Sequence, residues 1–199
     1  MKKLILLAIA VVLVIAVNAQ PRFGIKAGGN ISNLFESDDN GASGSHGARF
    51  GFHAGFMAEF PFANHFAIQP ELLFMHNGTD MKSQGSTANV KMNFIQAPVN
   101  FKYKFGPEQI KFFVMGGPYF GYAVSGKLKN SHGNFDIYGD EAKSLDWKRF
   151  DFGIGAGIGL EVSKFVFGLT SQYGITSITG MEGVTANFIT FQFSVGYFF

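Results

Sequence analysis

The sequence predicts an all-β protein, in which eight antiparallel strands close into an up-and-down barrel. Three observations support this fold class. Apolar residues alternate with polar residues or glycine along eight segments, which is the pattern of strands with one apolar face. The connections between the segments are alternately long and short. The last segment, residues 187–199, keeps an aromatic apolar face to its final residue, and a closed barrel leaves such a strand no free edge.

The alternation is clearest in the second predicted strand, where phenylalanine or alanine stands at every even position from 48 to 60. Pro70, Pro98 and Pro118 fall inside the third, fourth and fifth strands, where each removes a hydrogen-bond donor. They indicate a bulge, a local break or a strand boundary that lies elsewhere. The eight predicted strands are residues 22–32, 48–60, 66–76, 90–105, 110–124, 147–162, 165–176 and 187–199.

The connection lengths favour a transmembrane barrel of outer-membrane type over a soluble one. Outer-membrane barrels have an even number of strands, with short turns at one end and long loops at the other. Each predicted strand reaches the ~9–11 residues that cross the hydrocarbon layer at a tilt. A soluble barrel needs a polar outer face, and the sixth strand offers glycines at 153, 155, 157 and 159 instead. We therefore expect an integral protein of the cell outer membrane.

The N-terminus has the pattern of a secretory signal peptide. Lys2 and Lys3 precede an apolar run over residues 4–17, and small residues stand at Val17 and Ala19. The pattern predicts a signal peptide at 1–19, an outer-membrane β-barrel domain at 20–199 and two periplasmic termini. An uncleaved membrane anchor is the alternative, although the apolar run is short for one.

Composition excludes several classes of protein. A chain of 199 residues suits one domain, and the lack of cysteine excludes a disulfide framework and a lipoprotein anchor. Of 16 Lys and Arg, two belong to the predicted signal, so 14 remain against 14 Asp and Glu. This neutral balance gives no indication of a nucleic-acid partner.

Charged residues on the predicted inner face suggest a lumen charge network. Eight strands leave an interior just wide enough for side chains, and buried charges must pair. We expect salt bridges that fill and hold the barrel, with Lys102 near the periplasmic end. The alternative is a narrow gated pore, with Arg49, Glu59 and Glu71 as gate members. The predicted network comprises Arg22, Lys26, Arg49, Glu59, Glu71, Arg149, Asp151 and Glu161.

Catalysis and metal binding have weaker support. Some eight-stranded barrels modify lipids with Ser/His sets, and the candidates here are His132 with Ser131 and Asp136, or His46 with Ser45. No sharp motif surrounds either set, so we expect no catalytic residues and no enzyme. The five histidines are scattered, without the spacing of metal ligands, so no metal or cofactor is expected.

Two predicted loops, residues 33–47 and 125–146, carry charged residues that would suit adhesion or ligand binding at the cell surface, although the favoured interpretation is that they are plain connectors. Other expected partners are outer-membrane lipids, along the aromatic outer face, and the barrel-assembly machinery. Tyr197 and the final Phe199 resemble the C-terminal signal that this machinery reads.

Short motifs along the chain resemble one family of barrels. They are FGIKAGGNISNL at 23–34, FIQAPV at 94–99, GPYFGY at 117–122, FDFG at 150–153 and GIGLE at 157–161. Together these motifs resemble the PorT-like outer-membrane beta-barrel family of Bacteroidetes, often labelled porin-family proteins.

The resemblance covers essentially the whole mature chain. Because its motifs are structural, it implies fold and location rather than activity. Gln96 stands where the family pattern often has glutamate, which implies a weaker lumen contact at that position. The expected function is a structural or cell-surface interaction role; a narrow porin-like channel for small solutes or ions is the alternative, and a lipid-modifying enzyme a more distant one.

Overall fold

The structure is a computed structural model that describes most of the chain. The described residues contain no helix long and apolar enough to cross a membrane. The predicted signal peptide at 1–19 lies outside them. The described ranges are 20–38, 43–45, 47–83, 86–130, 133–138, 147–180 and 184–199.

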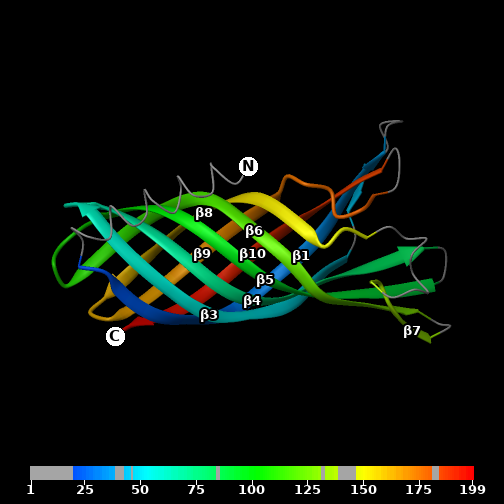
Figure 1. Ribbon diagram of the computed structural model, residues 1–199, viewed down its shortest axis with the longest axis horizontal. Coiled ribbons are helices and arrows are strands. Elements are labelled where there is room, and N and C mark those ends of the chain that lie inside the picture. The colour runs from blue at the N-terminus through cyan, green and yellow to red at the C-terminus, as the bar shows by residue number, and fades with distance from the viewer. Residues whose placement is uncertain are drawn as a thin grey trace, which may run out of the picture.

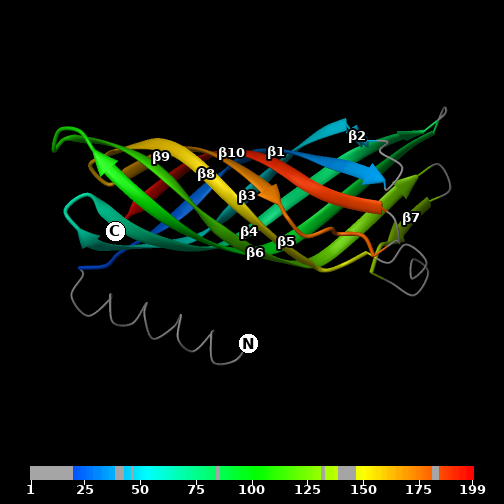
Figure 2. The ribbon, with the colours of Figure 1, turned by 90° about the horizontal axis from the view of Figure 1, so that it is seen from above.

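Eight long antiparallel strands form a closed barrel (Figures 1 and 2), as the sequence predicts. Each strand pairs with the next, and the last pairs with β1 to close the sheet. The short strands β2 (Ser43–Ser45) and β7 (Gly133–Asp136) pair with the ends of β1 and β6. The long strands are β1 (Arg22–Asp38), β3 (Gly47–Ala63), β4 (Phe66–Ser83), β5 (Ser86–Phe105), β6 (Ile110–Asn130), β8 (Phe150–Val162), β9 (Phe165–Gly174) and β10 (Val184–Phe198).

The two ends of the barrel differ. At one end, the turn end, lie the short turns at 64–65, 106–109 and 163–164, together with the start of β1 and the end of β10. Gly106 has a φ of 107° there, a backbone conformation that glycine adopts without strain. At the opposite end, the loop end, strands continue as long hairpins beyond the barrel (Figure 1).

Several predicted strand boundaries are wrong at the loop end. The predicted loops 33–47, 77–89 and 125–146 are partly strand, because β1 reaches Asp38, β4 and β5 run to Ser83 and Ser86, and β6 reaches Asn130. The hairpins are polar there and lose the apolar alternation, while their backbones stay paired, for example Met81 with Ala88. In the other direction, β8 begins only at Phe150 and β9 ends at Gly174.

The three prolines lie inside neighbouring strands, at a local break in the pairing. Pro70 is opposite Val99, and the β4–β5 pairing resumes in the same register at Leu73 and Gln96. Pro98 is opposite Tyr119, and the β5–β6 pairing likewise lapses before it resumes. Because no register shift occurs at these positions, a local break, not a bulge, accounts for the prolines.

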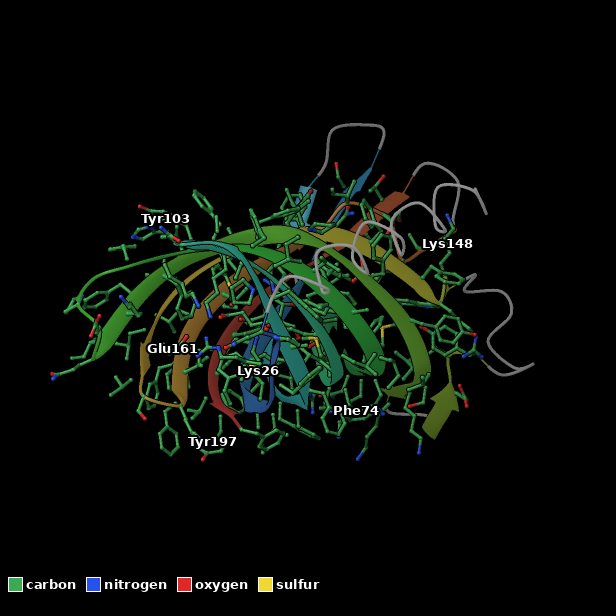
Figure 3. The ribbon with its side chains drawn as sticks, turned by 60° about the vertical axis from the view of Figure 1, so that its left-hand side comes forward. Lys26, Phe74, Tyr103, Lys148, Glu161 and Tyr197 are labelled. Carbon is green, nitrogen blue, oxygen red and sulfur yellow. The ribbon has the colours of Figure 1, made fainter. Side chains whose placement is uncertain are left out.

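An apolar belt covers the outside of the barrel. Its phenylalanines are largely exposed, with Phe50 at 74% and Phe150 at 72%. Figure 3 shows Phe74, Tyr103 and Tyr197 outside the ring of strands, and Lys26 and Glu161 inside it. The belt includes Ile25, Phe52, Phe74, Phe101, Phe120, Ile158, Leu169 and Phe193.

The glycines of β8 make room for large side chains of β6 in the interior. A Cβ on Gly153 would lie 2.5 Å from Cε1 of Tyr119, and a Cβ on Gly159 would lie 2.9 Å from Cε1 of Phe113. This packing accounts for the glycines at 153 and 159, whereas a Cβ on Gly155 or Gly157 would meet Gln172 or Thr170 of β9.

Candidate functional site: the barrel interior

An ion network fills the interior at the turn end. Glu59 is fully buried and accepts hydrogen bonds from Lys102 (2.9 Å), Lys104 and Arg22. The Arg22 guanidinium also donates to Glu161, so it joins β1 to both β3 and β8. This arrangement connects four different strands of the barrel through side chains.

A glutamine extends the network towards the middle of the barrel. Lys102 Nζ donates to Gln69 Oε1 at 3.1 Å, and Gln69 Nε2 donates to Glu71 Oε1 at 2.6 Å. Lys26 Nζ completes the chain with a 2.8 Å bond to Glu71 Oε2. The ion network thus comprises the cations Arg22, Lys26, Lys102 and Lys104, the carboxylates Glu59, Glu71 and Glu161, and Gln69.

Aromatic rings cover the buried cations. The Lys102 ammonium lies 4.1 Å from the centroid of the Phe113 ring and 5.8 Å from that of Phe198. The Arg22 guanidinium lies 4.3 Å from the Phe198 centroid. Phe198 is the last residue of β10, and it is only 1% exposed. Cation–π contacts with desolvated rings stabilise such charges.

A layer of amides and other polar groups spans the middle of the barrel. Gln192 Nε2 donates to Gln172 Oε1 at 2.7 Å, and Gln172 Nε2 donates to Gln96 Oε1 at 3.1 Å. Gln96 therefore makes a lumen contact through its amide. Nearby, His53 Nε2 lies 2.9 Å from Ser194 Oγ.

An apolar plug closes the interior at the loop end. Ile137, which follows β7, and Ile178, which follows β9, are buried between strand residues of the barrel wall. Tyr138 and Trp147 pack against them, and Trp147 pairs with Thr179. The apolar plug consists of Leu34, Leu73, Met75, Val90, Met92, Phe94, Ala123, Ile137, Ile178, Ala186 and Phe188.

Asp151 and Arg149, towards the loop end, bind different partners. Asp151 Oδ2 accepts a 3.1 Å hydrogen bond from Tyr119 Oη. Arg149 donates to the Ala123 carbonyl at 3.1 Å and stacks on Tyr138, with 4.1 Å to the ring centroid. Burial raises the pKa of Tyr138 to about 12, so the ring beneath the guanidinium stays neutral. Arg149 thus holds the turn after β7 against the barrel wall.

The three residues expected in a gate are not brought together. The side chain of Arg49 passes Gly78 and donates to Asn89 Oδ1 at 2.8 Å, in the outer part of β3. Glu59 and Glu71 belong to the ion network instead, where Lys102 and Gln69 connect them. An interior cavity beside Lys26 and Gln69 has a volume of only about 10 Å³, which is about the space of one water molecule.

The candidate catalytic sets are only partly described. Ser131, His132 and His46 lie outside the described residues, and so does the side chain of Ser45. Asp136 Oδ1 accepts a 2.9 Å hydrogen bond from the backbone amide of Tyr138. Within the described ranges, no group of three or more His, Asp or Glu residues is placed to hold a metal ion.

Comparison with known proteins identifies one family and several barrels of similar shape. The model of the outer membrane protein beta-barrel domain matches residues 18–180. The outer membrane protein OprG from Pseudomonas aeruginosa superposes with a TM-score of 0.51 at 12% identity, over 91% of this chain and 97% of that one.

Two further structures are less similar. They are the Neisserial surface protein A, with a TM-score of 0.47 at 11% identity (89% and 97% covered), and the attachment invasion locus protein Ail of Yersinia pestis, with 0.43 at 13% (89% and 98% covered). A search of curated proteins gives no match. At 12% identity, the OprG structure supports the barrel fold alone.

Proposed function

Because the chain belongs to the outer membrane protein beta-barrel domain family, we propose that it is a closed barrel with a structural or interaction role at the cell surface. It is a small integral protein of the outer membrane. The observation that carries the proposal is an interior filled at both ends, by the ion network and by the apolar plug. We assign it no catalytic residue, metal or cofactor.

A porin-like channel is the alternative to this role. Solutes could pass only if the apolar plug moved out of the loop end and the hydrogen bonds that Glu59 and Glu71 make in the ion network were broken. Breaking a buried ion pair costs about 3–5 kcal/mol when one partner is lost. The filled interior therefore favours a barrel that does not conduct in this state.

The proposal includes an orientation and a subgroup. We assign the turn end, with both mature termini, to the periplasm and the loop end to the outside, as in other barrels with short periplasmic turns. The signal peptide at 1–19 would be removed after export, and the barrel-assembly machinery would read Tyr197 and Phe199. We place the chain in the PorT-like group of Bacteroidetes on its motifs.

The hairpins of the loop end are the parts that would meet a ligand. Predicted binding segments 33–47 and 125–146 contain paired strand at 33–38 and 125–130, so the hairpins form stiff extensions rather than slack loops. The β4–β5 hairpin extends beside them to Ser83 and Ser86.

Trimming these hairpins should abolish adhesion and leave the barrel folded. Asp80 is directly opposite Asn89, so residues 81–88 can be replaced by Asn-Gly without a change of register. In the β6–β7 hairpin, residues 128–135 can be replaced in the same way, because Lys127 and Asp136 are directly opposite each other. The assay is attachment of expressing cells to a basement-membrane matrix and to one another.

A matched control trims nothing at the loop end but replaces residues 107–109 in a turn of the opposite end. This variant should attach like the wild type. Equal attachment by the hairpin variants, with heat-modifiable barrels on gels, would exclude these hairpins as the interaction surface.

A further inference from the structure

We propose that Lys91, Lys127 and Lys129 form a binding site for the phosphate groups of an outer-leaflet glycolipid. This site, the lysine face, lies on the hairpins just beyond the apolar belt. The inference rests on the proposed orientation, with the loop end outside.

The register places the three lysines on neighbouring positions of two paired strands. Lys91 of β5 is directly opposite Lys127 of β6, and Lys129 follows two residues later, opposite Asn89. All three side chains point away from Val90 and Met92, which belong to the apolar plug, and all three are exposed. Like charges directly opposite each other in a sheet are unfavourable, so an anion shared between them would stabilise the hairpin.

Within the described residues, no carboxylate makes an ion pair with this lysine face. Asp136 is opposite Lys127 on the other side, but its Oδ1 accepts a hydrogen bond from the Tyr138 amide. The lysine face therefore keeps a surplus of positive charge.

The height of the lysine face matches the head groups of a membrane. On β5 the apolar belt runs from Phe105 to Ile95, a separation of ten positions, or roughly 25 Å along the membrane normal at ~3.3 Å per residue and a ~40° tilt. Lys91 lies four residues further, roughly 10 Å beyond the last apolar side chain by the same reckoning. Phosphate groups lie at this depth, at the surface of the hydrocarbon layer.

The neighbouring side chains favour a lipid over a soluble anion. Val124 and Tyr122 of the belt stand on the same strand as Lys127, and both are exposed. A lipid that carries phosphates could place its acyl chains on these residues and its phosphates on the lysines. Lysine binds phosphate as a point charge that can reach along the surface.

Titration with lipid A tests the site on the purified barrel in detergent micelles, with native mass spectrometry as the readout. Each lysine near an anionic lipid contributes to the free energy of binding. The double variant with Lys91→Gln and Lys127→Gln should therefore bind lipid A roughly thirtyfold more weakly. Lys129→Gln alone should weaken binding by a smaller factor. All three positions are exposed, so the variants should keep the heat-modifiable mobility of a folded barrel.

The control pair, Lys111→Gln and Lys164→Gln, makes the same charge change at the turn end and should bind like the wild type. Dephosphorylated lipid A should bind about as weakly as the double variant binds lipid A, and inorganic phosphate should not displace lipid A.

Equal binding of lipid A by the double variant would overturn the proposal. So would an equal loss in the control pair, equal binding of the dephosphorylated lipid, or displacement by free phosphate. The titration uses no cells, so its result is independent of the adhesion assay. Either the lipid site or the proposed role at the cell surface can therefore be contradicted while the other is supported.

Discussion

Replacing Glu59 by glutamine should destabilise the barrel by about 3–5 kcal/mol, the typical cost of removing one partner from a buried ion pair. Glu59 accepts hydrogen bonds from three cations, and Lys102 beside it is fully buried. Without the carboxylate, the nearest remaining charge for Lys102 is Glu161, at 3.8 Å. Urea unfolding of the protein in lipid vesicles measures the loss.

Two companion variants separate this charge effect from others. Glu108→Gln makes the same charge change at an exposed turn residue and should alter stability by less than about 0.5 kcal/mol. Adding Lys102→Met to Glu59→Gln should recover part of the loss, because it removes the unpaired buried charge. If Glu59→Gln is as mild as Glu108→Gln, the ion network does not hold the turn end together.

Deleting residues 197–199 should abolish assembly in cells, seen as loss of the heat-modifiable band on gels. These residues close the barrel: Tyr197 and Phe198 are opposite Ile25 and Gly24, and the Phe199 amide donates to the Phe23 carbonyl at 2.9 Å. Phe198 also lies against Arg22 inside the barrel. The deletion thus removes strand pairing, lumen packing and the expected assembly signal together.

Single substitutions distinguish lumen packing from recognition by the assembly machinery. Phe198 is 1% exposed and Phe199 is 69% exposed, so Phe198→Ala should lower stability after refolding in detergent, whereas Phe199→Ala should refold normally there. In cells, Phe199→Ala should impair assembly, because the machinery would read the outer face of the strand. Normal insertion of the truncated chain would contradict the assigned role of the last three residues.

The sequence predicts the barrel well where lipid and lumen impose opposite chemistry on alternate residues. The even positions from 48 to 60 and the glycines of β8 follow this rule, and the strand order follows from the loop lengths. The same reasoning fails beyond the apolar belt. Residues 77–83 and 86–89 stay paired, but polar residues and glycine interrupt the apolar alternation that marks a strand in the sequence.

The interior could be predicted in composition but not in detail. Which side chains meet across a barrel depends on its tilt and stagger, which the sequence does not display. Gln69 is an example, since it connects Lys102 to Glu71. The partners of Arg49 and Arg149 are further examples, since Arg49 donates to Asn89 and Arg149 stacks on the ring of Tyr138.

The apolar plug was even harder to predict from the sequence than the ion network. Ile137 and Ile178 are single apolar residues in segments without periodicity, and their burial arises only when the connections fold over the barrel mouth.

The central claim is that the interior is closed by the ion network and the apolar plug. Planar-bilayer recording of the purified barrel tests it most directly, with a general porin in the same membrane as the positive control. We expect the protein to insert without measurable conductance. Reproducible channels in the wild-type protein, lost on Glu71→Ala, would contradict the claim and identify a gated pore.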